Sequence, residues 1–355
     1  MRHIVISIIL ILAFLSGFSQ TQQVLKNGFV AATDDGVWYL QDGFNEWVKL
    51  TIKDDGLYKN NEVDTIRTVT HNNRGLLYCI SNGVSIYNDY RYRWIRLDGK
   101  NINKKCGSGG GPYPVHMKAI SRFKHNKIVS WFYSFSFSSS TFAVQFDESI
   151  DNCASVGYSY GLNAIFTDMA SDNDTIACIV GENNKGLKYI VTNIVGNKDT
   201  ISISGLHSRS TDSHKITYNP DDDVFIIISD SGIVYSYDKT TLTTLDTVYL
   251  SGYVFDKIHD LAYNKNDQYY YMIMRRSSPD TNYSILMTDD FTSYKNIGLG
   301  SNYPPVLAVG NPYTLAVDSG VNVLIKNPSI PSYDLFPELP DRIVFDLDYI
   351  NYIPD

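Results

Sequence analysis

The sequence is poor in charged residues and in helix-type periodicity. Charged residues make up only 19% of the chain and hydrophobic residues 43%, which excludes a disordered protein. Beyond the N-terminus, no window of a dozen residues repeats apolar positions at the 3.6-residue spacing of a helix, and Gly, Asn, Asp and Ser interrupt the chain every few residues. A helical protein is therefore not expected.

Recognisable catalytic motifs are also missing. The chain has no Gly-x-Ser-x-Gly elbow, Walker loop, His-Glu-x-x-His or EF-hand loop. It has five glutamates, none in a pattern that fits a sialidase. We predict no catalytic residue and no cofactor. A carbohydrate-active enzyme that uses paired Asp carboxylates, such as a glycoside hydrolase or lyase of sialidase-like architecture, is the alternative.

Positive charge is scarce. The net charge is −8, and Lys and Arg occur only in short pairs. Because such a surface repels a phosphate backbone, we do not expect nucleic acid as a partner.

Cysteine occurs four times, without the paired spacing of a zinc site, so no metal is predicted. Cys79 and Cys178 lie inside apolar stretches, where small buried core residues are expected. Cys106 and Cys153 lie in polar, turn-rich stretches. Our hypothesis is that they form a disulfide that joins two loops.

Only one long apolar run occurs, at the N-terminus. It extends from Ile4 to Phe18 after a basic start and is followed by Ser19. This pattern predicts a secretory signal over residues 1–19, because about 15 apolar residues are fewer than the roughly 20 that span a bilayer. Residues 20–355 would then form one secreted, periplasmic or cell-surface domain with no integral membrane segment.

Strand-forming residues and hairpin signals dominate the rest of the chain. Tyr occurs 27 times and Phe 16 times, and Asn-Gly and Asp-Gly type pairs favour tight type I′ hairpins. The hairpin glycines before an alternating run are Gly36, Gly83, Gly186, Gly232 and Gly320. Two wider gaps leave room for hairpins near residues 140 and 283, which gives seven units of about 45 residues.

This period predicts an all-β fold, a single β-propeller of about seven four-stranded blades. The first unit lacks room for its opening strand, whereas Val344–Tyr349 matches Ile258–Tyr263 at its Asp, Leu and Tyr. We therefore expect the C-terminal strand to pair into the N-terminal blade and to close the ring, which removes an exposed edge.

Two stretches resemble known exported propellers of the WD40/YVTN-like kind. Residues 66–87 with Trp94 resemble a two-component-regulator propeller repeat. Thr288–Tyr294 resembles a degraded Asp-box (BNR-like) repeat, with Phe291 where that family favours Gly. The signal ending in Phe-Ser-Gln resembles exported Bacteroidetes proteins. The resemblance implies a fold and a location, and no activity.

Candidate ligand-binding residues lie near the starts of the units, where inner strands would face the central channel or its mouth. They are His116, Asp168, His214, His259 and Asp260. Convergent His and Asp side chains suit a polar ligand, and the alternative is solvated channel lining without a role. Asp221–Asp223, after Asn219-Pro220, is interpreted as a hairpin tip rather than a calcium site.

A glycine-rich insertion between the second and third units is the other candidate. Its notable residues are Gly107, Gly110 and Tyr113. Loops on a rigid scaffold often carry recognition, although a plain linker fits the composition as well. Together these features predict a monomeric, exported binding module whose ligand is a glycan, a peptide or a protein.

Overall fold

The computed structural model is built from antiparallel strands, and no helix occurs among the residues that it describes. It describes residues 27–44, 46–50, 214–278, 281–297, 305–310 and 343–350, the strands of the remaining segments, and positions 172 and 339. The predicted signal 1–19 and the loop residues Gly107, Gly110 and Tyr113 lie outside this part. A helix long and apolar enough to cross a membrane is not found among the described residues.

The first sheet combines both ends of the described chain. Its strand order is β3–β2–β1–β30. These strands are β1 (Gly28–Thr33), β2 (Gly36–Gln41), β3 (Val48–Lys49) and β30 (Val344–Ile350). The antiparallel pairing of β1 with β30 joins Gly28 to Ile350 and Ala31 to Leu347.

Each of the other six four-stranded sheets in the described part takes four consecutive strands. The second contains β6 (Thr68–His71), β7 (Leu77–Ile80), β8 (Gly83–Asn88) and β9 (Arg93–Asp98). The third contains β10 (Val115–Phe123), β11 (Lys127–Ser134), β12 (Ser140–Phe146) and β13 (Cys153–Ser155). The fourth contains β14 (Ile165–Ser171), β15 (Ile176–Glu182), β16 (Lys188–Ile194) and β17 (Asn197–Ser202).

The remaining sheets follow the same plan. The fifth contains β18 (His214–Asn219), β19 (Val224–Ser229), β20 (Ile233–Tyr237) and β21 (Leu242–Thr247). The sixth contains β22 (Val254–Asn264), β23 (Tyr269–Ser278), β24 (Tyr283–Thr288) and β25 (Lys295–Asn296). The seventh contains β26 (Val306–Val309), β27 (Thr314–Val317), β28 (Val323–Lys326) and β29 (Tyr333–Leu335), and a separate pair is β4 (Tyr58–Lys59) with β5 (Glu62–Val63).

The hairpins predicted from the sequence join the second and third strands of the sheets. Antiparallel pairing is found on both sides of all five glycine positions and of the two positions near residues 140 and 283. The type I′ geometry is wrong at Gly232, because only this residue of the Asp230–Gly232 turn has a positive φ, at +80°. Its amide donates to Ser229 O over 2.8 Å, as in a type I turn followed by a left-handed glycine.

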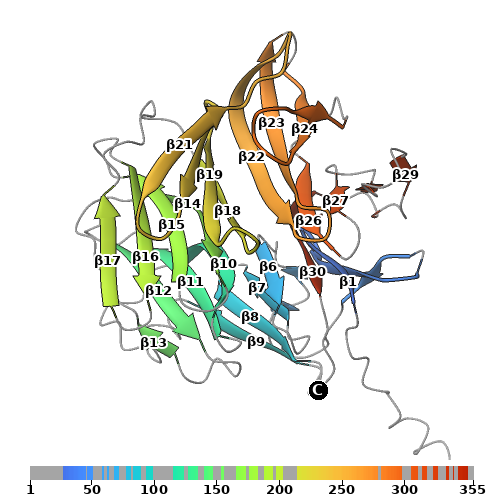
Figure 1. The fold of residues 1–355 in the computed structure, drawn as a ribbon. Coiled ribbons are helices and arrows are strands. Elements are labelled where there is room, and N and C mark those ends of the chain that lie inside the picture. The colour runs from blue at the N-terminus through green and yellow to red at the C-terminus, as the bar shows by residue number, and fades with distance from the viewer. Residues whose placement is uncertain are drawn as a thin grey trace, which may run out of the picture.

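The first strands of successive sheets lie against one another. Contacts run from β6 to β10, β14, β18, β22 and β26 in turn, and β30 contacts both β26 and β6. Figure 1 shows β6, β10, β18, β26 and β30 near the centre of the view and β13, β17, β21 and β29 toward its rim. We call β6, β10, β14, β18, β22, β26 and β30 the innermost strands.

Apolar side chains fill the space between neighbouring sheets. Ile226 and Ile228 of β19 pack with Ile258 and Leu261 of β22, and Met272 of β23 is fully buried in the same cluster. Burial of both faces explains why β19 and the first six residues of β23 are apolar or aromatic at nearly every position instead of alternating with polar ones.

The outer strands pack back on their neighbours. Trp47 and Leu50, which flank β3, are buried, and Leu50 N donates to Val37 O over 2.9 Å. Ile297 after β25 makes the same contact, donating to Ile285 O over 2.9 Å. The flanking residues therefore fix very short outer strands.

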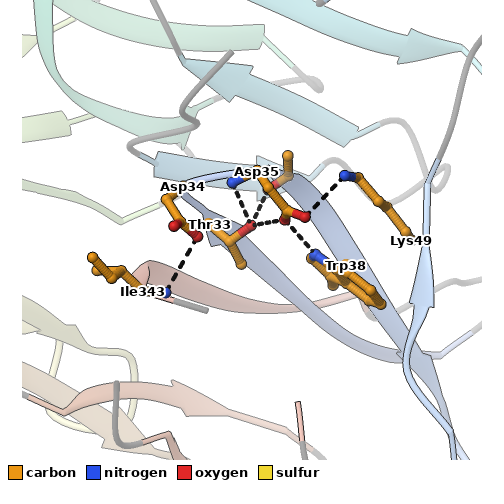
Figure 2. Close-up of polar contacts among 7 residues, drawn as sticks. Thr33, Asp34, Asp35, Trp38, Lys49 and Ile343 are labelled. Carbon is orange, nitrogen blue, oxygen red and sulfur yellow. Dashed lines mark hydrogen bonds and ion pairs between the residues drawn. The ribbon is translucent and has the colours of Figure 1, made fainter. Parts of the chain in front are cut away.

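The β1–β2 turn is organised by one carboxylate, shown in Figure 2. Asp35 Oδ1 accepts from Trp38 Nε1 over 2.9 Å, Asp35 Oδ2 accepts from Lys49 Nζ over 3.0 Å, and Thr33 Oγ1 lies 2.9 Å from Asp35 Oδ1. Burial raises the pKa of Asp35, but the hydrogen bonds from Trp38, Lys49 and Thr33 outweigh it and lower the pKa.

The neighbouring residue of this turn holds the start of the C-terminal strand. Asp34 Oδ1 accepts from Ile343 N, and Asp34 N donates to Ile343 O, both over 3.2 Å. The turn thus connects two segments 309 residues apart.

Asp221–Asp223 form a hairpin tip, as interpreted from the sequence. Asn219 Oδ1 accepts from the amides of Asp221 and Asp222, and Asp223 has φ +57°. The tip between β22 and β23 repeats this arrangement, with Asn264 as acceptor and Gln268 at φ +61°. Turn chemistry accounts for these polar residues.

Candidate ligand site

Three of the innermost strands, β14, β22 and β30, have a bulge that is followed by an aspartate. The pairing register shifts between Phe166 and Asp168 in β14 and between Ile258 and Asp260 in β22. In β30 it skips Phe345, just before Asp346. A bulge re-aims neighbouring side chains, and here it changes the direction of the aspartate on each strand.

Each of these aspartates accepts a hydrogen bond from the backbone of the next innermost strand. The bonds run from Ile216 N to Asp168 Oδ2 (2.9 Å), from Leu307 N to Asp260 Oδ2 (2.8 Å) and from Val69 N to Asp346 Oδ2 (3.0 Å). Each carboxylate therefore links one sheet to its neighbour.

In two of these carboxylates the second oxygen also accepts a hydrogen bond. Asp260 Oδ1 accepts from Leu261 N over 2.8 Å, and Asp346 Oδ1 accepts from Leu347 N over 2.9 Å. The two aspartates that the repeat matched in sequence thus make the same contacts.

Asp230 adds a fourth carboxylate from a turn instead of a strand. Its Oδ1 accepts from Ile258 N over 3.0 Å, which ties the β19–β20 turn to β22. Asp34 has the same relation to Ile343, so both turns lie beside the early residues of an innermost strand.

Lys215, the second residue of β18, lies within the field of all four carboxylates. Burial lowers the pKa of Lys215, but the negative charges of Asp168, Asp260, Asp346 and Asp230 outweigh it and raise the pKa. We call these five residues the Lys215 cluster. Its ammonium makes no hydrogen bond or ion pair with the described residues, although the cluster supplies its countercharge.

Asp260 has a raised pKa, mainly because it is buried. Burial raises its pKa and Asp168 adds to the rise, while Lys215 and the amides of Leu307 and Leu261 lower the pKa without cancelling it. Its carboxylate is therefore harder to ionise than an exposed one.

His259, the bulged residue of β22, is neutral at physiological pH. Burial lowers its pKa to about 3, and the charges of Lys215 and Lys257 act in the same direction. Its ring meets Tyr283 edge-on, with the ring centroids 5.7 Å apart. Its imidazole ring therefore lies next to an aromatic ring.

The structure brings only some of the predicted residues together. Asp168, Asp260 and His259 belong to or adjoin the Lys215 cluster. His214 is only 1% exposed and sits inside the protein, opposite Ser229. His116 of β10 pairs with Tyr133 of β11, and the side chain of His116 lies outside the described part of the structure.

The structure describes three of the four cysteines, each in a strand. Cys79 and Cys178 lie in β7 and β15, which are second strands of their sheets. Cys153 begins β13, whereas Cys106 lies outside the described residues, so the predicted disulfide stays a prediction.

Sequence reasoning missed Lys215, Asp230 and Asp346 as site residues. Asp346 was matched to Asp260 but used only for the fold, and Lys215 stands next to His214 without a motif of its own. Of these three residues, only Asp346 had a signal in the sequence that could have marked it as a site residue, namely its match to Asp260.

Exposed side chains lie at the beginning of β22. Tyr249 is 70% exposed and Val254 is 58% exposed. Between them, Tyr253 N donates to Leu250 O over 3.0 Å, and Arg276 lies 5.1 Å from the Tyr253 ring centre. In Figure 1, β22 and β23 extend beyond neighbouring strands at this end.

Metal binding finds no support in the part of the chain that the structure describes. No group of three or more His, Cys, Asp or Glu residues there could hold an ion.

Comparison with known proteins gives a fold and no family. No protein-family model and no curated protein matches the sequence. Among solved structures, the chain is similar to the extracellular domain of a hybrid two-component system from B. thetaiotaomicron, at 12% identity and a TM-score of 0.58. The match covers 82% of this chain but only 36% of that one.

Two further solved structures match over most of both chains. A Bacteroides uniformis protein named as a candidate 6-phosphogluconolactonase matches at 11% identity and a TM-score of 0.57, over 92% of this chain and 100% of the other. The β-propeller domain of Myceliophteria thermophila Cps50 (Swd1) matches at 10% identity and a TM-score of 0.52, over 80% and 90%. The likeness supports a propeller-like, all-β fold.

Proposed function

We propose that the chain is an exported, monomeric β-propeller of seven blades that acts as a binding module. The seven four-stranded sheets, the contacts of β30 with both β26 and β6, and the pairing of β30 with β1 support a ring closed by the C-terminal strand. The likeness to a β-propeller domain supports the same architecture.

The ligand site of this module is the end of the sheets where the innermost strands begin. One observation carries this assignment: Lys215 stands among four carboxylates without a direct hydrogen-bond partner in the described part of the chain. A polar ligand would supply that partner. His259 and Tyr283 add an uncharged imidazole and an aromatic face beside it.

The binding function is tested with arrays of glycans and of peptides, probed with the purified protein and with Lys215→Met. Binding that the substitution changes supports the site. Retention of every hit by the variant, with an unchanged affinity, places the ligand elsewhere and overturns the assignment.

The export proposal has its own test. Mass spectrometry of the protein recovered from the periplasm or medium of a bacterial host should give a chain that begins at Gln20. A cell-associated chain that keeps Met1 contradicts a cleaved signal over residues 1–19.

A second candidate function is a carbohydrate-active enzyme, such as a hydrolase or lyase. It is favoured by the raised pKa of Asp260, because a carboxyl group that is harder to ionise can act as a general acid. Turnover in a broad glycosidase and lyase panel, abolished in Asp260→Asn, would establish it. Binding without turnover favours the module.

A further inference from the structure

A row of polar side chains crosses the sixth sheet near the start of β22. Lys257 of β22 is the register partner of Arg275 of β23, and Arg275 is also the partner of Tyr283 of β24. Partners in antiparallel strands carry their side chains on the same face, so these three lie side by side. His259 joins them, because its ring meets the Tyr283 ring edge-on with the centroids 5.7 Å apart. We call these four residues the β22–β24 row.

The two cations of the row face each other, and the described residues supply an anionic partner to only one of them. Arg275 Nε donates to Asp256 Oδ1 over 2.9 Å, and Arg275 Nη2 donates to Asp256 Oδ2 over 2.8 Å. Lys257 makes no hydrogen bond or ion pair with the residues that the structure describes. Like charges directly opposite each other in a sheet destabilise the pair. An anionic group beside Lys257 would relieve this repulsion.

The row can be reached from solvent. The side chain of Arg275 is 40% exposed, whereas Tyr283 is only 8% exposed. Lys257 and His259 are half-buried between these extremes. Asp230, whose carboxylate accepts from the backbone of β22, is only 7% exposed. An anion that arrives from solvent therefore meets the cations of the row more readily than this carboxylate.

Two members of the row can both donate and accept hydrogen bonds. The hydroxyl of Tyr283 and the neutral imidazole of His259 make no hydrogen bond with the described residues. Each offers one donor and at least one acceptor. The hydroxyl groups of a sugar have the same dual capacity, whereas the carboxylate of an acidic side chain only accepts. The row thus suits a ligand that combines an anionic group with hydroxyl groups.

We infer that the ligand of the proposed binding site is an acidic oligosaccharide. Its carboxylate or sulfate group lies against Lys257 and Arg275, and hydroxyl groups of the same sugar bond to Tyr283 and His259. Arg275 keeps N–H donors beyond the two that Asp256 uses, so it can still donate to the anion. This inference rests on the proposed function, which places the ligand beside the same imidazole and tyrosine.

The first test is an array printed with uronate-containing, sulfated and neutral oligosaccharides and with oligo-glutamate peptides. Only acidic oligosaccharides should bind the purified protein, and the two acidic sets distinguish a carboxylate from a sulfate. Fluorescence anisotropy of a labelled array hit then gives the affinity of each variant. Lys257→Met should weaken binding about tenfold, because it removes the charge and keeps the apolar stem. Added salt should weaken the binding of the unaltered protein.

The matched control is Lys265→Met, which makes the same change of charge and atoms just beyond the other end of β22. Lys265 is exposed there, and its replacement should leave the affinity unchanged. Lys257→Arg keeps the charge and should retain binding, which separates loss of the anion contact from loss of the fold. Tyr283→Phe removes only the hydroxyl, keeps the ring against His259 and should weaken binding several-fold.

Different outcomes separate this inference from the proposed function. Hits among neutral oligosaccharides that Lys215→Met weakens and Lys257→Met leaves unchanged would overturn the acidic ligand and leave the proposed site in place. Binding of oligo-glutamate in place of the oligosaccharides would overturn the sugar as the ligand. Binding of acidic oligosaccharides that neither Lys257→Met nor Lys215→Met changes would remove both this inference and the proposed site.

Discussion

Replacement of Asp346 by Ala tests how the C-terminal strand is held. The substitution removes both acceptors of the carboxylate and leaves Val69 N and Leu347 N without them. An amide that loses its acceptor in a partly buried position costs about 1–3 kcal/mol. Relief of repulsion within the Lys215 cluster offsets part of this, so we expect a net loss of about 2–4 kcal/mol in the free energy of unfolding.

Asp260→Ala should give a similar loss, because Asp260 makes the same two contacts with Leu307 N and Leu261 N. Asp346→Asn should lose less than Asp346→Ala, since the amide oxygen can still accept one of the two bonds. The comparison substitution Asp256→Ala breaks an exposed ion pair with Arg275 and should cost less than about 1 kcal/mol.

The assay is urea unfolding at pH 7 with the slope and the midpoint fitted separately. A shift of the midpoint at constant slope reports stability. The reasoning is refuted if Asp346→Ala costs no more than Asp256→Ala. A large loss for Asp260→Ala with none for Asp346→Ala would show that β30 is not held in the sheet in solution.

Three further predictions concern single sites. Because the pKa of Asp35 is lowered in the fold, its stabilising contribution is present above the unfolded value near 3.8 and is lost as the pH falls through the folded pKa. In urea titrations Asp35→Asn should therefore destabilise the fold at pH 7, and this loss should shrink as the pH is lowered below 3.8. A loss that does not change with pH would contradict the network of Figure 2. Gly28→Ala should lower the free energy of unfolding by about 1–3 kcal/mol, because a Cβ there would lie 2.3 Å from Leu40 O. Gly43→Ala has open space around its Cβ and should cost only about 1 kcal/mol, for its φ of +79°. Thermal unfolding of both variants checks this order. NMR should show the His259 ring neutral from pH 8 to pH 5, as its pKa near 3 requires, and a titration near pH 6.5 would show that the ring is solvated.

The strands and their hairpins follow from local chemistry. Alternating or wholly apolar runs bounded by turn residues predict strands, and Gly232 at positive φ shows why glycine recurs at the hairpins. The detailed turn type was wrong there, because the same residues also suit a type I turn with a left-handed glycine. The pattern of residues cannot separate turns that use glycine at different positions.

The sequence repeat also predicted part of the candidate site. Asp168 and Asp260 were selected from the sequence, and the match of Asp346 to Asp260 extends to their hydrogen bonds. The glycine-rich loop around Gly110 stays a prediction, because it lies outside the described residues.

By itself the sequence determined strand identity, hairpin positions and the repeat, since these depend on residues within a few positions of one another. Only the tertiary structure decided which strands meet: Asp346 accepts from Val69, 277 residues away. It alone placed Lys215 among carboxylates from β14, β22, β30 and the Asp230 turn. The charge of such a cluster depends on distances between sheets, and no spacing along the chain encodes them.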